Sequence, residues 1–336
     1  MSEEFKVSVV IPVYNAAAFV HEAVESALAL EATGEVLLIE DASPDDSLAV
    51  CEALVEANPD RVRLLRHPNG DNRGAGPSRN LGIRNARCDF VAFLDADDFF
   101  LPNRFEVAAR IFAERPDVDG VYEAIDVYYQ TLEAQIAWIT SATSRPTTLV
   151  TMRTEHPPQE LFERLVLGQA GGFISMVGVT IKREVFDRPC GLFDPIRHED
   201  KAMFIKLAAF ATLVPGRLDE PVARYRVHGD NRTIKAPNRH TFEQRQRIMW
   251  ETLWAWGQAN LDVERQHILD QALVSHHAVG YRRYSKIDRW VTGSARFLHS
   301  KFKLLRFVMQ NPSFLLKTSF WRRLFTRRVS LAHWDR

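Results

Sequence analysis

The segment of residues 90–98, FVAFLDADD, constrains the fold of this chain more than any other stretch. Its apolar part, from Phe90 to Leu94, has the length and composition of a strand that is covered on both faces. Three carboxylates follow at once, those of Asp95, Asp97 and Asp98. In an extended continuation, Asp95 and Asp97 would point to one side and Asp98 to the other. The pattern therefore predicts a buried strand that ends in a cluster of negative charge.

Carboxylates this close together repel one another unless a cation neutralises them. A hard divalent cation such as Mn²⁺ or Mg²⁺ takes oxygen ligands and leaves room for substrate phosphates, which would turn the cluster into a binding site. The alternative is a solvated acidic turn after the strand. The motif alone leaves both interpretations open.

The residues before this segment alternate between strand and helix patterns. Apolar runs at residues 6–13, 35–39 and 62–65 predict strands, helical periods at 19–28 and 48–56 predict helices, and another helix begins near Ser78. This alternation predicts an α/β fold with a doubly wound, mostly parallel sheet, which binds ligands at the carboxyl ends of its strands. The glycines at residues 67–76 do not form a dinucleotide-binding fingerprint, because Arg79 stands where the last glycine belongs.

Composition indicates a folded protein with an uneven distribution of charge. The chain has 336 residues, 46% of them apolar, which is enough for one large domain or two of ordinary size. Residues 281–336 contain 14 Lys and Arg against two acids, whereas the first 280 contain 29 against 41. The body is acidic and the C-terminal region is basic.

The cysteines and the N-terminus indicate a cytoplasmic location. Cys51, Cys88 and Cys190 are odd in number and lack metal-type spacing, so we expect reduced thiols and no disulfide. The N-terminus carries acids where a signal peptide carries bases. No apolar run approaches the roughly 18–20 residues of a membrane-spanning helix. Any membrane contact is therefore expected to be peripheral, on the inner face of the plasma membrane.

Four segments occur in the order and spacing of a known family. They are VSVVIPVYN, LLIEDASPDDS, GAGPSRNLGIRNA and FVAFLDADD. Together they resemble the nucleotide-binding half of a family 2 glycosyltransferase with the GT-A fold. Downstream, VGVTIKREVFDRPCGLFD and RHEDKAMFIKLA resemble the family's strand, helix and turn that lead to an acidic helix, and RYRVHGDNRT resembles its Tyr-Arg-x-His loop.

The resemblance implies a GT-A nucleotide-diphospho-sugar transferase domain over residues 1–235. Its nucleotide-binding half would span about residues 1–104 and its acceptor half about residues 105–235. A helical, basic and aromatic C-terminal extension would follow at residues 236–336. Residues 118–172 carry no clear pattern; their aromatics are expected in the core, with acceptor contact as the alternative. These aromatics are Tyr122, Tyr128, Tyr129 and Trp138.

The resemblance also implies roles for individual residues. The residues expected to bind the nucleotide are Pro12, Tyr14, Asn15, Asp41, Arg79, Asp95, Asp97 and Arg226. Asp97, Asp98 and His228 are expected to hold Mn²⁺ or Mg²⁺, which stabilises the departing diphosphate. Asp41 is expected to accept a hydrogen bond from the base, with a helix cap as the alternative role.

Asp200 is the expected catalytic base, and Glu199 is expected to position it. A free carboxylate has a pKa of about 4, so it accepts a proton from a sugar hydroxyl only late in the reaction, which suits an inverting single displacement. The alternative is an acidic first turn of a helix at residues 199–209, stabilised by the helix dipole.

The implied activity is that of a metal-dependent, inverting glycosyltransferase. It would move one sugar from a nucleoside diphosphate sugar, with a UDP-sugar favoured, to a hydroxyl of a glycan or lipid-linked acceptor, in cell-surface polysaccharide or glycoconjugate synthesis. Met249 replaces the arginine of the Gln-x-x-Arg-Trp motif of processive relatives, which favours non-processive transfer. The alternatives are a nucleotidyltransferase and a catalytically silent, membrane-associated nucleotide-sugar-binding protein.

The basic C-terminal region has two interpretations. Leu316, Phe320 and Leu324 recur at helical spacing among bases, which suits an interfacial helix on anionic lipid. The alternative is a helical subdomain whose bases pair with the acidic body. That acidic body argues against a nucleic acid partner.

Overall fold

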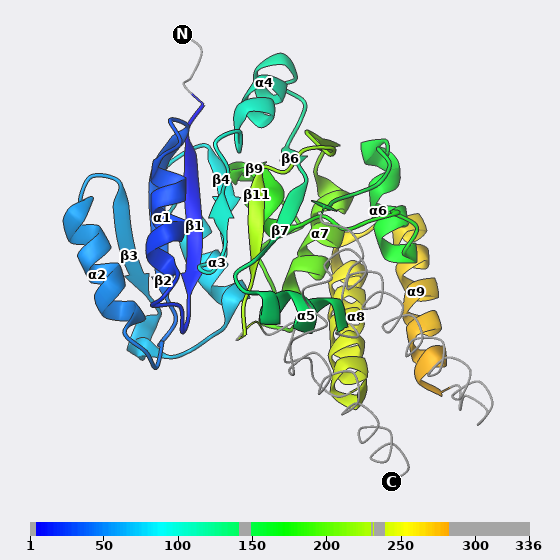
Figure 1. Cartoon of the computed structure of the whole chain (residues 1–336). Helices are drawn as coiled ribbons and strands as arrows, with labels where there is room; N and C mark the ends of the chain where they lie inside the picture. The colour runs from blue at the N-terminus through cyan, green and yellow to red at the C-terminus, as the bar shows by residue number, and fades with distance from the viewer. Residues whose placement is uncertain (1–4, 141–148, 230, 232–238, 282–336) are drawn as a thin grey trace, which may run out of the picture. The chain divides into compact units, whose positions relative to one another are not determined.

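The computed structural model describes residues 5–140, 149–229, 231 and 239–281 (Figure 1). Contacts divide the chain into two compact units. The first contains residues 1–128, 147–226 and 237–281, and the second contains residues 129–146, 227–236 and 282–336. The predicted membrane-binding residues Leu316, Phe320 and Leu324 lie outside the described residues. The predicted domain division after residue 235 stays a prediction.

A seven-stranded sheet forms the centre of the first unit, in the order β10-β6-β9-β4-β1-β2-β3. Its strands are β1 (Val7–Val13), β2 (Thr33–Glu40), β3 (Val62–Arg66), β4 (Phe90–Phe93), β6 (Gly120–Tyr122), β9 (Val179–Lys182) and β10 (Leu213–Pro215). Strand β9 runs antiparallel to β4 and β6, and the other neighbouring pairs are parallel. The predicted mostly parallel α/β sheet is therefore confirmed.

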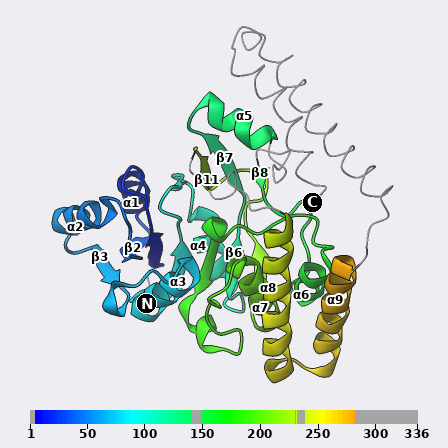
Figure 2. The same cartoon turned by 90° about the horizontal axis from the view of Figure 1, so that it is seen from below.

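Helices cover both faces of the sheet. Helices α1 (Val20–Leu28) and α2 (Ser47–Ala57) lie on one side of β1, β2 and β3, and α3 (Ala75–Asn85) lies on the other (Figure 2). Because both faces are covered, six of the seven residues of β1 are buried. Helix α4 (Glu106–Glu114) packs Ala108 and Phe112 against Val121 and Val214 of the sheet.

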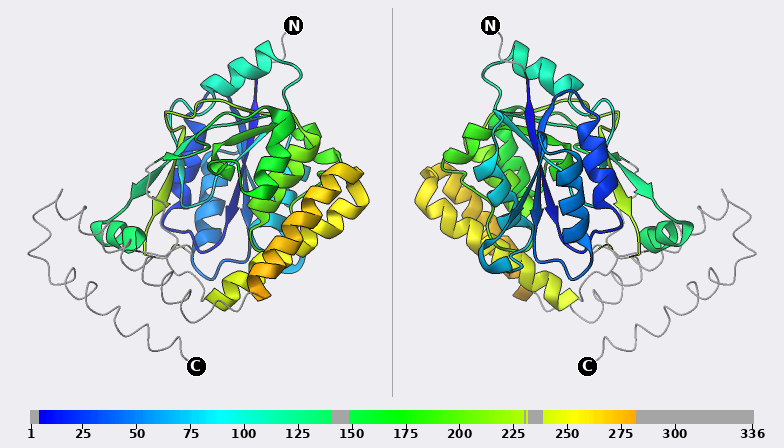
Figure 3. Two further views of the ribbon diagram at one scale, coloured as in Figure 1. Left: turned by 90° about the vertical axis from the view of Figure 1, so that its right-hand side faces the viewer. Right: turned by 90° about the vertical axis from the view of Figure 1, so that its left-hand side faces the viewer.

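Four helices follow the predicted nucleotide-binding half in the first unit. Helices α6 (Pro158–Leu167) and α7 (Glu199–Phe210) pack together, and α8 (Arg239–Asn260) and α9 (Val263–Tyr281) form a helical hairpin beside them (Figure 3). The predicted helical pattern after Phe242 is thus confirmed as far as Tyr281. Within the described residues, no helix has the length and apolar character needed to cross a membrane.

A smaller sheet follows the order β5-β11-β7-β8. Its strands are β5 (Phe99–Phe100), β7 (Ile125–Tyr129), β8 (Leu149–Val150) and β11 (Ala223–Val227). The expected Tyr-Arg-x-His loop is wrong in its first part, because Arg224 to Val227 belong to β11. Ala223 pairs with Phe100, which joins this segment to the residues that follow the acid cluster.

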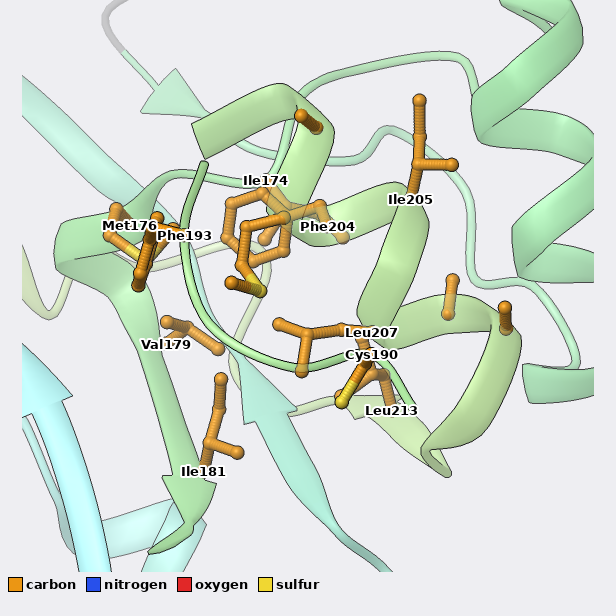
Figure 4. Close-up of a cluster of buried hydrophobic side chains, with 14 of the residues drawn as sticks. Ile174, Met176, Val179, Ile181, Cys190, Phe193, Phe204, Ile205, Leu207 and Leu213 are labelled. Carbon is orange, nitrogen blue, oxygen red and sulfur yellow. The ribbon is translucent and has the colours of Figure 1, made fainter. Parts of the chain in front are cut away.

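Helix α7 is held by a large apolar core (Figure 4). Val179 and Ile181 of β9 face Phe204 and Leu207 of α7, with Phe193 beside them. The other labelled members of this cluster are Ile174, Met176, Cys190, Ile205 and Leu213. Because this packing fixes the helix against the sheet, it also fixes the position of the acidic residues that begin α7.

The outer strand β3 carries two arginines that pair with carboxylates of β2. The Arg63 guanidinium lies 2.8 Å from Glu35, and that of Arg66 lies 2.9 Å from Glu40. Both carboxylates are almost fully buried, whereas the arginines are partly exposed. Charged side chains therefore line this edge of the sheet.

The described part of the second unit consists mainly of α5 (Leu132–Thr140). The Thr131 hydroxyl accepts a hydrogen bond from the Ala134 amide and so caps this helix. Trp138 is 5% exposed and Tyr122, in the first unit, is 2% exposed, so both are core residues as expected. Tyr128 is 37% exposed and is the aromatic of residues 118–172 that departs most from this expectation.

Candidate active site

The carboxyl ends of the parallel strands β1, β2 and β4 lie at one edge of the sheet (Figure 1), and Asn15, Asp41 and Asp95 follow them in the chain. Asn15 follows β1 in the left-handed backbone region, with φ 53°, and its amide donates to the Ser43 hydroxyl over 3.2 Å. Pro12 pairs with Ile39 within the sheet, and Tyr14 is 53% exposed. The strand ends therefore present an accessible aromatic ring beside a fixed turn.

Asp41 organises the loop that leads into α3. Its carboxylate oxygens accept hydrogen bonds from the amides of Arg73 and Gly74, each over 2.7 Å. Its carbonyl accepts another from the Asn72 side chain over 2.8 Å. The helix-cap alternative is wrong, because Asp45 instead accepts hydrogen bonds from Ser47 at the start of α2. Base recognition by Asp41 stays a prediction.

The acid cluster forms a turn and not an extended continuation of β4. The strand ends at Phe93, and the Asp98 amide donates to the Asp95 carbonyl over 3.0 Å. The expected extended continuation is therefore wrong, although Asp98 is still separated from Asp95 and Asp97 by its burial. The turn buries Asp98 to 1% exposure and leaves Asp95 and Asp97 partly exposed.

Asp98 carries a buried oxygen that has no partner among the described residues. Its Oδ1 accepts a hydrogen bond from the Arg226 amide over 2.9 Å, whereas Oδ2 makes none. Burial, together with the charges of Asp97 and Asp95, raises the pKa of Asp98 well above its ordinary value. A cation beside Oδ2 would satisfy this oxygen and favour the ionised form.

The described residues contain no group of three or more His, Cys, Asp or Glu side chains already arranged around a common metal position. The orphaned oxygen of Asp98 and its two acidic neighbours nevertheless fit a hard divalent cation that keeps water or phosphate among its ligands. The acid turn therefore meets the chemical requirement for a metal site.

Arg79 of α3 joins the acid turn to the start of α7. Its Nη2 lies 2.7 Å from Asp95 Oδ1, and its Nη1 lies 3.2 Å from Glu199 Oε1. The guanidinium lies over the Phe193 ring at 5.5 Å and its side chain is 5% exposed. Burial lowers the pKa of Arg79, but the charges of Asp95, Glu199 and Asp200 outweigh it and raise the pKa overall.

Arg226 of β11 holds the acid turn from the other side. Its Nε donates to the Asp97 carbonyl over 2.9 Å, and its Nη2 lies 2.6 Å from Glu22 of α1. The guanidinium lies within 5.6 Å of three aromatic ring centres, those of Phe19, Phe99 and Tyr128. These contacts make Arg226 a support of the turn. A phosphate contact by Arg226 stays a prediction.

Helix α7 begins with the two predicted catalytic acids. His198 precedes it in the left-handed region, with φ 64°, so the chain turns sharply into Glu199 and Asp200. Glu199 contacts Arg79, and Asp200 Oδ1 accepts a hydrogen bond from the Lys201 amide over 2.9 Å. Both acids also lie in the first helical turn, where the helix dipole stabilises negative charge. The dipole role and the catalytic role are compatible.

His228 lies in the second unit, where its amide donates to the Asn231 side chain. Its role as a metal ligand stays a prediction.

Several residues at the site were not predicted from the sequence. Glu22 lies on α1, more than 200 positions from its partner Arg226. Asn80 exchanges two hydrogen bonds of 2.8 Å with the backbone of Phe193 and so ties α3 to the turn before α7. Asn80 belongs to the motif that contains Arg79, but residue spacing alone did not predict that its partner would be Phe193.

Comparison with known proteins identifies the family. The family described as glycosyl transferase family 2 matches residues 8–188. The chain therefore belongs to glycosyl transferase family 2, and the glycosyltransferase interpretation is confirmed over the nucleotidyltransferase alternative.

Particular relatives extend this match. An uncharacterised glycosyltransferase of Nostoc sp. is 27% identical over 93% of this chain and 97% of its own length. The succinoglycan biosynthesis protein ExoO of Rhizobium meliloti is 43% identical over 36% of this chain and 32% of its own length.

Solved structures confirm the GT-A fold. S. aureus TarS 1–349 in complex with UDP-GlcNAc matches with a TM-score of 0.58 and 17% identity, over 85% of this chain and 75% of TarS. The mannosyltransferase PcManGT of Pyrobaculum calidifontis, in complex with GDP-Man and Mn²⁺, matches with a TM-score of 0.50 and 16% identity, over 97% of this chain and 85% of the other.

Proposed function

We propose that this glycosyltransferase is metal-dependent, inverting and non-processive, and that it moves one sugar from a nucleoside diphosphate sugar to a hydroxyl of a glycan or lipid-linked acceptor. The observation that carries the proposal is the Arg79 bridge, which links the acid turn at Asp95 to Glu199, the neighbour of Asp200. A donor-binding turn and a candidate base are thereby held in one network.

The donor would lie at the carboxyl ends of β1, β2 and β4. Pro12, Tyr14, Asn15 and Asp41 are proposed to line the nucleotide pocket. Asp95, Asp97, Arg79 and Arg226 are proposed to lie near the ribose and the diphosphate. A UDP-sugar is favoured because TarS was solved with UDP-GlcNAc, whereas the GDP-Man complex of PcManGT makes GDP-sugars the first competitor to test.

Asp97 and Asp98, with His228 as a further proposed ligand, would hold Mn²⁺ or Mg²⁺. When bound, the cation supplies positive charge for the departing diphosphate. Asp98 is suited to this role because its buried Oδ2 lacks a partner among the described residues.

Asp200 is the proposed base. As the acceptor oxygen forms its bond to the anomeric carbon, the bond from that carbon to the diphosphate breaks on the opposite side, and its electron pair leaves with the diphosphate. The acceptor proton passes to Asp200 late in this step. Glu199, fixed by Arg79, is proposed to position Asp200 from the same helical turn.

The relatives suggest the biological setting. ExoO is named for succinoglycan biosynthesis, and GgaA of Bacillus subtilis for minor teichoic acid biosynthesis. We therefore propose a role for this enzyme in cell-surface polysaccharide or glycoconjugate synthesis, and we propose that it acts in the cytoplasm.

A thermal-shift screen tests donor binding. The full chain is heated with UDP, GDP, dTDP and their sugars, with and without Mn²⁺. We expect uridine nucleotides with Mn²⁺ to raise Tm most. A bound ligand raises Tm because, at 100 times its Kd, it stabilises the folded state by about 2.7 kcal/mol. The Mn²⁺-dependent part of the shift is expected to disappear in Asp98→Asn. If no nucleotide raised Tm with any metal, the proposed function would be wrong.

Turnover tests the base. Asp200→Asn is expected to keep the nucleotide-induced Tm shift and to lose at least about 100-fold in transfer and donor hydrolysis, because general base catalysis contributes about 10²–10⁴-fold. Asp187→Asn, at an exposed position, is the control. Near wild-type turnover of Asp200→Asn would remove Asp200 from this role.

A further inference from the structure

The start of α8 places an exposed aromatic ring beside His198, two residues before the proposed base Asp200. Phe242 is 44% exposed, and its ring stands edge-on to the His198 imidazole, with centroids 5.6 Å apart and planes at 82°. His198 immediately precedes Glu199 and Asp200 at the start of α7. Phe242 thus offers apolar surface next to the turn from which the two acids of α7 follow.

Arg245 lies three residues further along α8, on the same face as Phe242. Burial is the main cause that lowers the pKa of His198; the charges of Asp200 and Glu199 oppose this effect, and those of Lys201 and Arg245 add to it. Among the residues that the structure describes, Arg245 has no hydrogen-bond or ion-pair partner. Arg247, two residues on, instead lies 3.7 Å from Glu251 of its own helix.

Lys201 completes the group from the α7 side. Its Nζ lies 4.9 Å from the centre of the Trp250 ring, and Trp250 is 1% exposed. Burial lowers the pKa of Lys201, although the charge of Asp200 opposes this effect. The start of α7 therefore has basic side chains and an accessible aromatic ring nearby, and the transfer step proposed above uses neither Phe242 nor Arg245.

We propose that Phe242 and Arg245 form an acceptor subsite that takes a sugar bearing an anionic group. The C–H face of the acceptor ring packs on Phe242, and Arg245 pairs with a phosphate or carboxylate of the acceptor. Packing the apolar face of a sugar on an aromatic ring is favourable because both surfaces lose contact with water. The planar guanidinium can bind either anion through two parallel hydrogen bonds. The proposal rests on the proposed function, because Asp200 as base fixes where the acceptor hydroxyl lies.

Equilibrium binding of three probe acceptors tests the proposal on the full chain with UDP and Mn²⁺. The probes are a neutral glucose trisaccharide, the same trisaccharide with a terminal phosphate, and a trisaccharide of glucuronic acid. We expect at least one anionic probe to bind about tenfold more tightly than the neutral one, as a charge-assisted hydrogen bond allows. The probe that gains most shows whether phosphate or carboxylate is preferred.

The variants separate the two side chains. Arg245→Gln is expected to remove the preference for the anionic probe, and Arg245→Lys to keep part of it. Phe242→Ala is expected to weaken all probes about tenfold, whereas Phe242→Tyr retains the ring and the affinity. Arg247→Gln is the matched control on the same helix and is expected to change nothing.

The Tm shift with UDP and Mn²⁺ separates failure of this proposal from failure of the proposed function. That shift is expected to be unchanged in every variant. If the wild type binds no anionic probe more tightly than the neutral one, or if Arg245→Gln behaves like Arg247→Gln, the subsite is wrong while donor binding stands. If the wild type shows no Tm shift with any nucleotide, the proposed function itself fails.

Discussion

Arg79 is a nearly buried cation whose stability depends on the acids around it. Asp95 and Glu199 each bind one of its terminal nitrogens, and Phe193 covers one face of the guanidinium. A buried charge is tolerated only when such partners compensate its lost hydration. The residue that anchors the acid turn is therefore also the one that contacts Glu199, beside the proposed base.

Replacing Arg79 is expected to reduce both stability and turnover. Arg79→Met leaves Asp95 and Glu199 without their cation, at a cost of about 2 kcal/mol, since Asp95 is partly exposed and regains water. Displacement of the acids is expected to lower kcat about 100-fold. Thermal unfolding and steady-state kinetics measure the two effects. Arg84→Met, exposed on the same helix, is the control, and equal results for the two variants would contradict the assigned role.

Glu123 provides a pH-dependent test of a buried pair away from the site. Burial raises its pKa to about 6, against the opposing charges of Arg104 and Arg217, and burial lowers the pKa of Arg104 to about 10. Between about pH 4.5 and 6 the folded state keeps this proton while the unfolded state releases it. Stability is therefore lost as pH rises through this window.

The stability of the wild type relative to Glu123→Gln is expected to fall as the pH rises from about 4.5 to 6, because the variant lacks this titration. Urea denaturation at several pH values measures the difference. Glu114→Gln, at an exposed position, is expected to show no such slope. A constant difference across the window would show that Glu123 titrates normally.

At the scale of elements, the strands of residues 1–104 were predictable from the sequence, and the contacts at their carboxyl ends were not. Strands β1, β2, β3 and β4 end within two residues of the sequence-based ranges, because apolar runs and turn residues mark them locally. The acid turn at Asp95 was not predicted, because an alternating residue pattern does not indicate the hydrogen bond from the Asp98 amide to the Asp95 carbonyl. The partners of Arg79 and Arg226 escaped because they come from distant segments.

The middle of the chain shows a second limit. Residues 118–140 and 149–172 contain short strands and helices whose burial is decided by long-range packing and not by periodicity. The sequence predicted a role for Asp200 but none for Phe242 or Arg245. Only the packing of α8 against α7 brings Phe242 beside His198.

Helix α3 approaches β1 closely at Gly82, which sets how Arg79 reaches the site. A Cβ at Gly82 would lie 2.3 Å from Val10 Cγ1, and Val10 is fully buried. Gly82→Ala gains about 1 kcal/mol of helix propensity, but overpacking costs about 1–3 kcal/mol. We expect a net loss of stability in thermal unfolding, with recovery in the double variant with Val10→Ala. A Gly82→Ala protein more stable than wild type would show that α3 shifts freely.

At the scale of the whole molecule, charge is divided between an acidic body and a basic C-terminal region. Residues 281–336 hold 14 of the 43 Lys and Arg and only two of the 43 acids. Such a division suits attraction to an anionic surface, with each base near the membrane contributing about 1 kcal/mol. The prediction rests on the sequence, because residues 282–336 lie outside the described part of the chain.

Charge reversal in the full chain tests the membrane prediction. The wild type is expected to sediment with vesicles that contain phosphatidylglycerol, and reversal of four C-terminal arginines is expected to weaken this binding at least about 100-fold. The reversed residues are Arg322, Arg323, Arg327 and Arg328. The control changes net charge equally by reversing exposed arginines of the body, Arg84, Arg87, Arg110 and Arg153. Equal loss in both variants would favour an effect of net charge alone.

The arginines on β3 have a consequence for how the protein behaves at high concentration. As the last strand of the large sheet, β3 has one side whose backbone groups pair with no strand of that sheet and so present a template for another chain. Arg63 and Arg66 give this outermost strand two charged side chains, and their ion pairs with Glu35 and Glu40 hold both guanidinium groups against β2. A second copy that paired its own β3 with this strand would bring the arginines of the two copies close together and remove water from around them. The same ion pairs that secure β3 to β2 thereby act against edge-to-edge aggregation.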